Sequence, residues 1–233
     1  MPPKTAEPIE LKEACVRAAR EVIAEHGVEH LSLRDVARRL GVSHQAPYKH
    51  YPSRDHLLAE VIRRCFESFT RFLEARERFD DPSADLESMG RQYLSFAAKH
   101  PLEYRLMFST PWPEAAQHPS LVAEGRHSFD TLRGVLRRMH GEGAAQRNAV
   151  DLDALFIWSS MHGLTGVMHH NLTGDLDLSP QVTHDSAQHV ISMISIAMTA
   201  RLRSAAAAKA VEPTCAEKPS TTRVLKRRGR VRA

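Results

Sequence analysis

The sequence has few cysteines and no segment suited to crossing a membrane. Its 233 residues include three cysteines, Cys15, Cys65 and Cys215, which stand far apart without the spacing of a zinc site. This usage fits a reducing compartment. Residues 1–14 lack the apolar core of a signal peptide, so we expect a cytoplasmic protein. Long uncharged apolar runs are missing, and we therefore expect no transmembrane helix and no membrane partner.

Alternating apolar and polar runs, the pattern of a half-buried β-strand, are close to absent. Val, Ile and Thr are dispersed among residues with helical spacing instead. Hydrophobic residues make up 42% of the chain, which is enough for a sizeable core. The sequence therefore predicts an all-α protein.

Common catalytic and nucleotide-binding motifs are also missing. The chain has no G-x-S-x-G, P-loop or G-x-G-x-x-G. Its 14 histidines suggest a metal site, yet they do not form a ligand pattern. His169 and His170 are adjacent and point to different faces of a helix, and Glu124 to His127 is a single E-x-x-H where a di-metal bundle needs two. We expect no enzymatic activity, no cofactor and no metal site.

Positive charge is concentrated at the C-terminal end. The whole chain carries +4, but residues 201–233 hold ten Lys/Arg against two Asp/Glu, which leaves −4 for residues 1–200. We expect residues 204–233 to form a disordered basic tail, because their composition cannot bury a core. Two roles stay open for this tail: phosphate contacts without sequence preference, or a solvated end without function.

A helix-turn-helix pattern is present in residues 31–51, LSLRDVARRLGVSHQAPYKHY. Ser32 is a good N-cap for a helix with regularly spaced apolar residues, and Gly41 suits the left-handed residue that ends it. Ser43 would cap a second short helix that runs to about His50. In such a unit the second helix enters the major groove of DNA. Its polar, cationic and aromatic side chains favour base and phosphate contacts over burial.

The order SLRDVA, GVS, YKHY and SRDHLL resembles the DNA-binding domain of TetR-type transcriptional regulators, over residues 8–68. Pro47 departs from this pattern, because the family more often has Leu there. A proline at this position removes one early hydrogen bond, so we expect a slightly tightened or bent recognition helix. Motif position and side-chain chemistry together predict DNA contacts by Ser32, Arg34, Ser43, His44, Gln45, Tyr48, Lys49, His50 and Arg54.

These residues divide by the group that they would contact. Gln45 can bond adenine through two hydrogen bonds, and Lys49 or His44 can reach guanine or phosphate. The resemblance gives Arg34 a base or phosphate contact and gives Tyr48, His50 and Arg54 phosphate contacts. The hydroxyls of Ser32 and Ser43, at the helix starts, suit phosphate contacts as well, and such contacts set the register on DNA.

Helical periodicity divides the chain into a small DNA-reading unit and a larger body. We expect a flexible arm at residues 1–8, a DNA-binding domain at 9–55 and a helical effector-binding and dimerisation domain at 56–203. One helix from Ser53 to about Phe79 would connect the two units and act as a lever between them.

The body contains many aromatic and Met residues at helical spacing. Each is more simply explained as core, but together they are compatible with an apolar pocket, which the resemblance implies. Trp158, His162 and Gly163 look like the Trp-His-Gly signature of one class of TetR-type C-terminal domains, as does HPLEYRLMF at 100–108. His162 is either a polar group of the pocket or, as we favour, a hydrogen-bonded core or interface histidine. The candidate pocket residues are Phe69, Met89, Tyr93, Tyr104, Met107, Phe108, Trp112, Phe129, Trp158 and His162.

Residues 180–203 are apolar around most of a helix, so this helix needs cover on more than one side. We expect a homodimer through a four-helix bundle of residues 151–171 and 180–203 from both subunits, with the central helix of a monomer as the alternative. TetR-type regulators usually dimerise in this way. The sequence thus predicts a repressor that leaves a palindromic operator in double-stranded DNA when an unknown small-molecule effector binds. An activator of the same family, or an all-α ligand-binding protein or enzyme, is the alternative.

Overall fold

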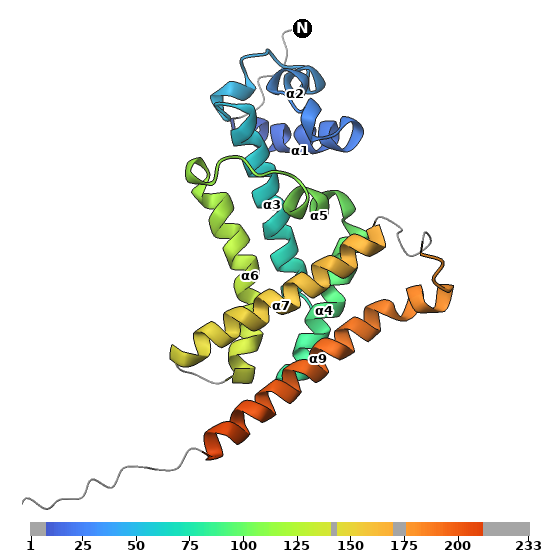
Figure 1. The fold of residues 1–233 in the computed structure, drawn as a ribbon. Helices are drawn as coiled ribbons and strands as arrows, with labels where there is room; N and C mark the ends of the chain where they lie inside the picture. The colour runs from blue at the N-terminus through green and yellow to red at the C-terminus, as the bar shows by residue number, and fades with distance from the viewer. Residues whose placement is uncertain (1–7, 141–143, 170–175, 212–233) are drawn as a thin grey trace, which may run out of the picture.

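The computed structural model describes residues 8–140, 144–169 and 176–211, and these contain helices and connecting segments without a β-strand (Figure 1). The predicted all-α fold is confirmed for this part of the chain. The elements of the small N-terminal unit are α1 (Pro8–His26), η1 (Val28–His30), α2 (Leu33–Leu40) and η2 (Pro47–Lys49), where η denotes a 3-10 helix. The body contains α3 (Arg54–Glu74), α4 (Pro82–Lys99), α5 (Pro101–Phe108), η3 (Ala115–Gln117), α6 (Pro119–His140), α7 (Ala144–His169) and α9 (Pro180–Val211).

The small unit has a core between α1, α2 and the first half of α3. Cys15, Val36, Leu57 and Val61 are fully buried there. Cys15 lies on the buried face of α1, and burial raises the pKa of its thiol. It therefore behaves as a small hydrophobic side chain.

The long helix α3 runs from the small unit into the body (Figure 1). Ser53 caps it as predicted, because its hydroxyl accepts the backbone N–H of His56 at 3.3 Å. At 1.5 Å per residue the helix is about 30 Å long. Its buried apolar residues serve both cores, Leu57 and Val61 in the small unit and Phe69 in the body.

The predicted end of this helix at Phe79 is wrong, since α3 stops at Glu74. Arg76 folds back over the helix end, where its guanidinium donates to the carbonyl of Leu73 at 2.9 Å and to Asp85 at 3.0 Å. These bonds satisfy a terminal carbonyl that helix continuation would have used, so the chain turns toward α4.

Two further helix boundaries differ from the predicted ones. The helix α7 begins seven residues before the predicted residue 151. At the other end of the body, α9 continues through 204–211, the first part of the predicted tail. That stretch is rich in Ala, the strongest helix former.

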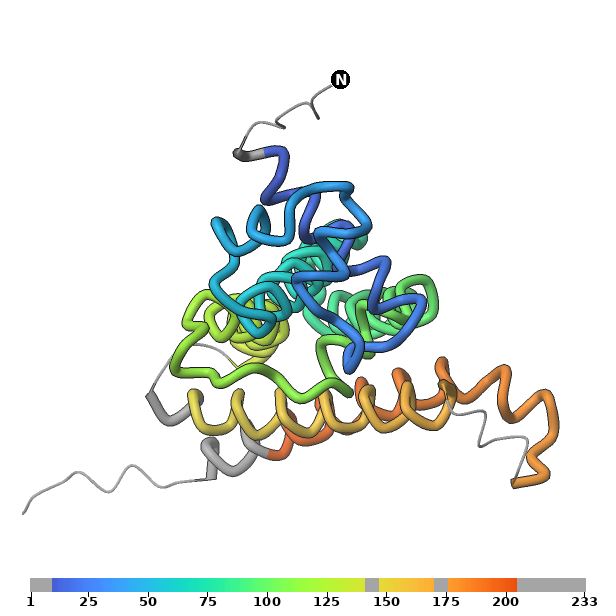
Figure 2. Tube along the Cα trace, turned by 90° about the horizontal axis from the view of Figure 1, so that it is seen from above, coloured from blue at the N-terminus to red at the C-terminus, as the bar shows by residue number. Residues whose placement is uncertain are grey.

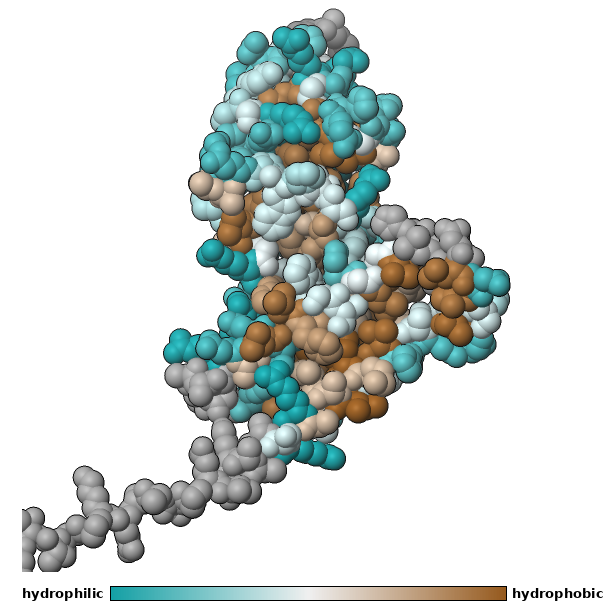
Figure 3. Space-filling view, viewed as in Figure 1, coloured by the Kyte–Doolittle hydropathy of each residue, from teal (hydrophilic) through white to brown (hydrophobic). Residues whose placement is uncertain are grey.

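The two last long helices form the outer layer of the body. α7 and α9 lie together along one side of the molecule and cross α4 (Figures 1 and 2). Their inward residues, such as Ala154 and Ile191, are buried. Their outward surface exposes large apolar side chains (Figure 3), namely Leu152, Leu155, Phe156, Val167, Met168, Val182, Met193 and Ile196. Within the described part of the chain, no helix combines the length and the hydrophobicity that a membrane span requires.

Candidate nucleic-acid interface and ligand cavity

The first helix of the predicted motif has the expected caps. The Ser32 hydroxyl accepts the N–H of Asp35 at 3.1 Å and also donates to the carboxylate of that residue. At the other end, Gly41 has a φ of 64°, and its N–H reaches the carbonyls of Ala37 and Arg38. The hydroxyl hydrogen of Ser32 is already donated to Asp35. A phosphate could therefore bind this hydroxyl only by sharing that hydrogen with the Asp35 carboxylate.

The second element of the motif is not the predicted α-helix. Residues 43–50, which we name the recognition segment, form a turn followed by the 3-10 helix η2. Pro47 has no N–H to close a bond to the carbonyl of Ser43, and that carbonyl accepts the N–H of Ala46 at 2.9 Å instead. His50 likewise donates to the carbonyl of Pro47 at 3.0 Å. The expected tightening at Pro47 therefore extends over the whole segment.

The recognition segment presents polar side chains to solvent. The buried rings of Pro47 and Tyr51 anchor it to the small unit. Its exposed side chains are those of Ser43, His44, Gln45, Tyr48 and Lys49, and His50 is half-buried. On α2, Arg34 is exposed and has no ion-pair partner within the described residues. These positions suit contact with a polar, anionic surface, and their contacts with DNA stay predictions.

Arg54 is engaged inside the protein. Its Nη2 donates to the carbonyl of Val28 at 2.7 Å, its Nε donates to the carbonyl of Leu31 at 3.1 Å, and its Nη1 contacts Asp55 at 3.0 Å. The side chain thus fastens the start of α3 to the segment before α2. A phosphate contact by Arg54 also stays a prediction, with 40% of the side chain exposed.

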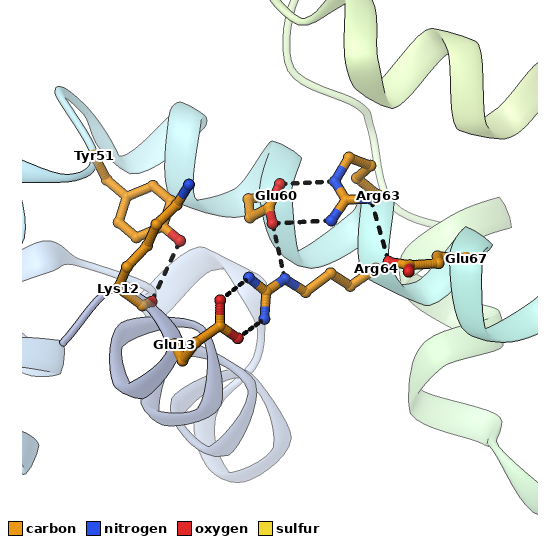
Figure 4. A network of polar contacts seen from close by, with 7 residues as sticks. All are labelled: Lys12, Glu13, Tyr51, Glu60, Arg63, Arg64 and Glu67. Carbon is orange, nitrogen blue, oxygen red and sulfur yellow. Dashed lines mark hydrogen bonds and ion pairs between the residues drawn. The ribbon is translucent and has the colours of Figure 1, made fainter. Parts of the chain in front are cut away.

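A network of ion pairs fastens α1 to α3 (Figure 4). Arg64 holds the Glu13 carboxylate with both terminal nitrogens, one at 2.6 Å, and donates through Nε to Glu60 at 2.8 Å. Arg63 also binds Glu60, at 2.8 Å, and reaches Glu67 at 3.2 Å. The hydrogen bonds of Arg64 lower the pKa of Glu13. The spacing of Glu and Arg three and four residues apart along α3 predicts the ion pairs within this helix, although we did not draw that prediction above.

Two contacts join the small unit directly to the body. Arg20 of α1 forms an ion pair with Glu103 of α5. The rings of His56 on α3 and His118 before α6 meet edge to face, with centroids 4.9 Å apart. Burial and the neighbouring His56 lower the pKa of the buried His118. The small unit therefore has ties to the body beyond the α3 backbone.

A cavity of about 520 Å³ lies in the body, within the range of small-molecule sites. It is bounded by side chains of α3, α4, α5, α6, α7 and α9, and its lining is mostly apolar. The predicted pocket residues among its lining are Phe69, Met89, Tyr93, Met107, Phe108, Trp112, Phe129, Trp158 and His162. The tenth, Tyr104, is buried and does not line the cavity.

Tyr104 connects two of the lining residues. Its hydroxyl is 2.8 Å from the hydroxyl of Tyr93 and 2.7 Å from Nδ1 of His162. Burial lowers the pKa of His162 and raises that of Tyr104. His162 combines both interpretations from the sequence, because it is hydrogen-bonded within the body and also faces the cavity.

Sequence reasoning missed the rest of the lining, which comprises two glycines, several aliphatic residues, Phe66, Met161 and the polar residues Glu87, Ser128 and Thr131. A Cβ atom added to Gly125 would lie 2.9 Å from the ring of Trp112, and one added to Gly90 would lie 3.2 Å from Ile191. Glycine at these two positions therefore leaves room for the neighbouring side chains of Trp112 and Ile191. Glycine is unfavourable inside a helix, and this is the feature of the sequence that could have drawn attention to both positions. Gly163 of the Trp-His-Gly signature has no neighbouring atom within 4 Å of such a Cβ in the described residues.

The fold and these two sites define a helix-turn-helix protein with a helical, cavity-bearing body. Residues 16–61 match the family described as bacterial regulatory proteins, tetR family, and residues 86–194 match the tetracyclin repressor-like C-terminal domain. The chain belongs to the TetR family of regulators, as its resemblance implied. Both matched families consist of regulators, not enzymes.

Similar proteins come from Mycobacterium tuberculosis and Rhodococcus. An HTH-type transcriptional regulator of Mycobacterium tuberculosis is 31% identical over 111 residues, covering 46% of this chain and 47% of the relative. The chain thus spans about half the length of the curated relatives it matches. The structure of a protein of unknown function from Rhodococcus sp. RHA1 matches with a TM-score of 0.61 and 26% identity, covering 85% of this chain and 97% of that one. A transcriptional regulator from the same source matches with a TM-score of 0.57 and 26% identity, covering 81% and 96%.

Within the described residues, no three His, Cys, Asp or Glu side chains gather as a metal site would require. Residues 1–7 of the predicted arm and residues 212–233 of the predicted basic tail lie outside the described part of the chain, and Pro8, the last residue of the predicted arm, begins α1.

Proposed function

We propose that this protein is a dimeric, sequence-specific DNA-binding regulator that represses transcription until a small molecule enters the body. The main observation in support of this proposal is the exposure of the recognition segment. It offers Gln45 and Lys49 on a short rigid support, while Pro47 behind them is buried. Amide and ammonium groups so placed match the chemistry of base edges and phosphates.

A second copy would cover the apolar outer surface of α7 and α9. Leu155 is 52% exposed, Met193 50% and Ile196 60%, which is costly for a free surface. The symmetry of a dimer would place two recognition segments on one palindromic site, with half-sites a helical turn or so apart. Replacing Ile196 by Glu should yield monomers in analytical ultracentrifugation and abolish tight binding to the palindrome. The exposed Gln117→Glu variant is the control, and a monomeric wild-type protein would contradict the dimer.

Release of the protein from DNA by a ligand is supported by the position of the cavity beside α3. The cavity wall includes Phe66 and Phe69 of α3, the same helix that begins beside the recognition segment. A ligand that fits only one tilt of α3 would bias the spacing of the two recognition segments, which couples the two sites. The repressor direction is supported by the tetracyclin repressor-like domain that the body matches. An activator would use the same geometry, and a reporter gene behind the operator distinguishes the two.

The direct test is retention of genomic fragments by the purified protein in the presence of excess non-specific DNA. We expect a few fragments that share a palindrome, protected from nuclease over both half-sites. A variant with Ala at Gln45, Tyr48 and Lys49 should fold normally, because all three side chains are exposed, and should lose this selectivity. Equal retention of every fragment by the wild-type protein would contradict sequence-specific regulation.

A further inference from the structure

The cavity contains few polar side chains, and most of their hydrogens are already donated within the protein. The hydroxyl of Ser128 donates to the carbonyl of Gly125 at 2.8 Å, and that of Thr131 donates to the carbonyl of Ser128 at 2.6 Å. The indole N–H of Trp112 donates to the carbonyl of Met107 at 2.9 Å. These groups therefore have no hydrogen left for a ligand.

The hydroxyl chain behind the cavity fixes the tautomer of His162. Within the described residues, Tyr104 is the hydrogen-bond partner of the Tyr93 hydroxyl, so Tyr93 donates to Tyr104. Tyr104 then donates to Nδ1 of His162. In a neutral imidazole whose Nδ1 accepts, the hydrogen lies on Nε2. The burial that lowers the pKa of His162 favours this neutral ring.

Two N–H donors of the lining are left without a partner in the described part of the chain: Nε2 of His162 and the indole nitrogen of Trp158. They stand one turn apart on α7, with ring centroids 5.7 Å apart. Among the described residues, the lining contains no Lys or Arg and a single carboxylate, that of Glu87, which lies 3.6 Å from Arg91. A ligand thus meets donors on one wall and has no cation to neutralise a negative charge.

We propose that the cavity binds an uncharged, largely apolar and aromatic molecule with one hydrogen-bond acceptor, a carbonyl or ether oxygen, directed at His162 and Trp158. The aromatic part would pack among the rings of Phe66, Phe69 and Phe129, which favour edge contacts with other rings. This rests on the proposed function, in which the cavity is the effector site, and specifies the chemical class of the effector. Charged molecules are rejected because burying an unpaired charge is costly.

The two tryptophans of the chain, Trp112 and Trp158, both line the cavity, so tryptophan fluorescence reports its occupancy directly. Four probes share two phenyl rings and differ at the bridge: benzophenone, diphenylmethane, diphenylacetate and diphenylmethylammonium. We expect benzophenone to bind roughly 3- to 10-fold more tightly than diphenylmethane, the gain of one net hydrogen bond. Both ions should bind about 100-fold more weakly than benzophenone.

A variant separates hydrogen bonding from packing. His162→Phe keeps a ring in the wall and removes its N–H, so the preference for benzophenone over diphenylmethane should fall toward one. Met161→Leu, an apolar change in the same wall, should leave that preference unchanged. Equal binding of the ketone and the hydrocarbon by the wild-type protein would overturn the proposal. So would tightest binding of either ion, a preference that survives in His162→Phe, or absence of quenching by benzophenone.

DNA binding is measured separately on the same protein. Loss of sequence-selective retention with the benzophenone preference intact would contradict the proposed function alone. Selective retention without that preference would contradict only the ligand class.

Discussion

Gln45 and Lys49 stand exposed on one short segment, yet their side chains would make different contributions to DNA binding. Gln45→Ala should relax the preference at one base pair by about 1–3 kcal/mol, because an amide can bond adenine through two hydrogen bonds. Lys49→Ala should weaken binding to all sequences alike and reduce the salt dependence, as loss of a phosphate contact does. Fluorescence anisotropy on the operator and its single-base variants, at several salt concentrations, measures both effects. An equal loss on every sequence for Gln45→Ala would reassign Gln45 to a phosphate.

Individual residues of the cavity were predictable as a set and less so one by one. The aromatic and Met positions of the body form most of the lining, since large apolar side chains at helical spacing must face the space between helices. Tyr104 differs because its hydroxyl needs partners, which Tyr93 and His162 supply behind the wall. Which of two tyrosines faces a cavity depends on packing between helices far apart in sequence, and periodicity alone does not carry that information.

Among the elements, the end of α3 depends on one buried carboxylate. Asp85 is fully buried and pairs with the buried Arg76 and with Arg138. Asp85→Asn should destabilise the fold by about 3–5 kcal/mol, because the Arg76 charge would stay buried without its counter-charge. Urea denaturation measures the free energy of unfolding. Asp81→Asn at the start of the same helix is the matched control, since Asn caps helices as well as Asp does. Equal costs for the two variants would contradict this role.

Helix centres followed from the sequence, whereas several helix ends did not. The apolar stripes of α1, α3 and α9 follow from the spacing of apolar residues within each helix, which can be read directly from the sequence. The end of α3 is set by Arg76 folding onto Leu73, a contact supported by Asp85 from another helix. The recognition segment is an intermediate case. Pro47 predicted a local tightening of the helix. The 3-10 geometry extends further along the segment, because the N–H groups of Ala46 and His50 bond to carbonyls three residues before them.

For the whole molecule, the contacts between the two units suggest how ligand and DNA would communicate. α5 carries Glu103, which pairs with Arg20 of the small unit, and also Met107 and Phe108, which line the cavity. A ligand that displaces α5 would therefore shift the Arg20–Glu103 ion pair on α1, and the same ligand would also contact α3. The His56–His118 contact lies on a separate connection, through the segment before α6.

Two histidines should make the stability of the molecule sensitive to acid. Burial lowers the folded-state pKa of His118 at the junction of the two units and of His162 at the cavity below the ordinary value of about 6.5. Between the folded and unfolded pKa values the unfolded chain binds more protons, so the free energy of unfolding increases with pH. The contribution is complete above about pH 6.5 and is lost as the pH falls through the lowered folded-state values.

Urea denaturation between pH 8 and pH 5 should therefore show stability falling below about pH 6.5. The slope with pH should become shallower in His118→Asn and in His162→Phe, and shallowest in the double variant, because each removes one proton-binding group. His30→Gln, at an exposed site before α2 where the described residues form no ion pair with the ring, is the control and should keep the wild-type slope. Since the slope and not the absolute stability is compared, packing losses caused by the substitutions do not obscure the result. A double variant with the full wild-type slope would show that other groups cause the acid sensitivity.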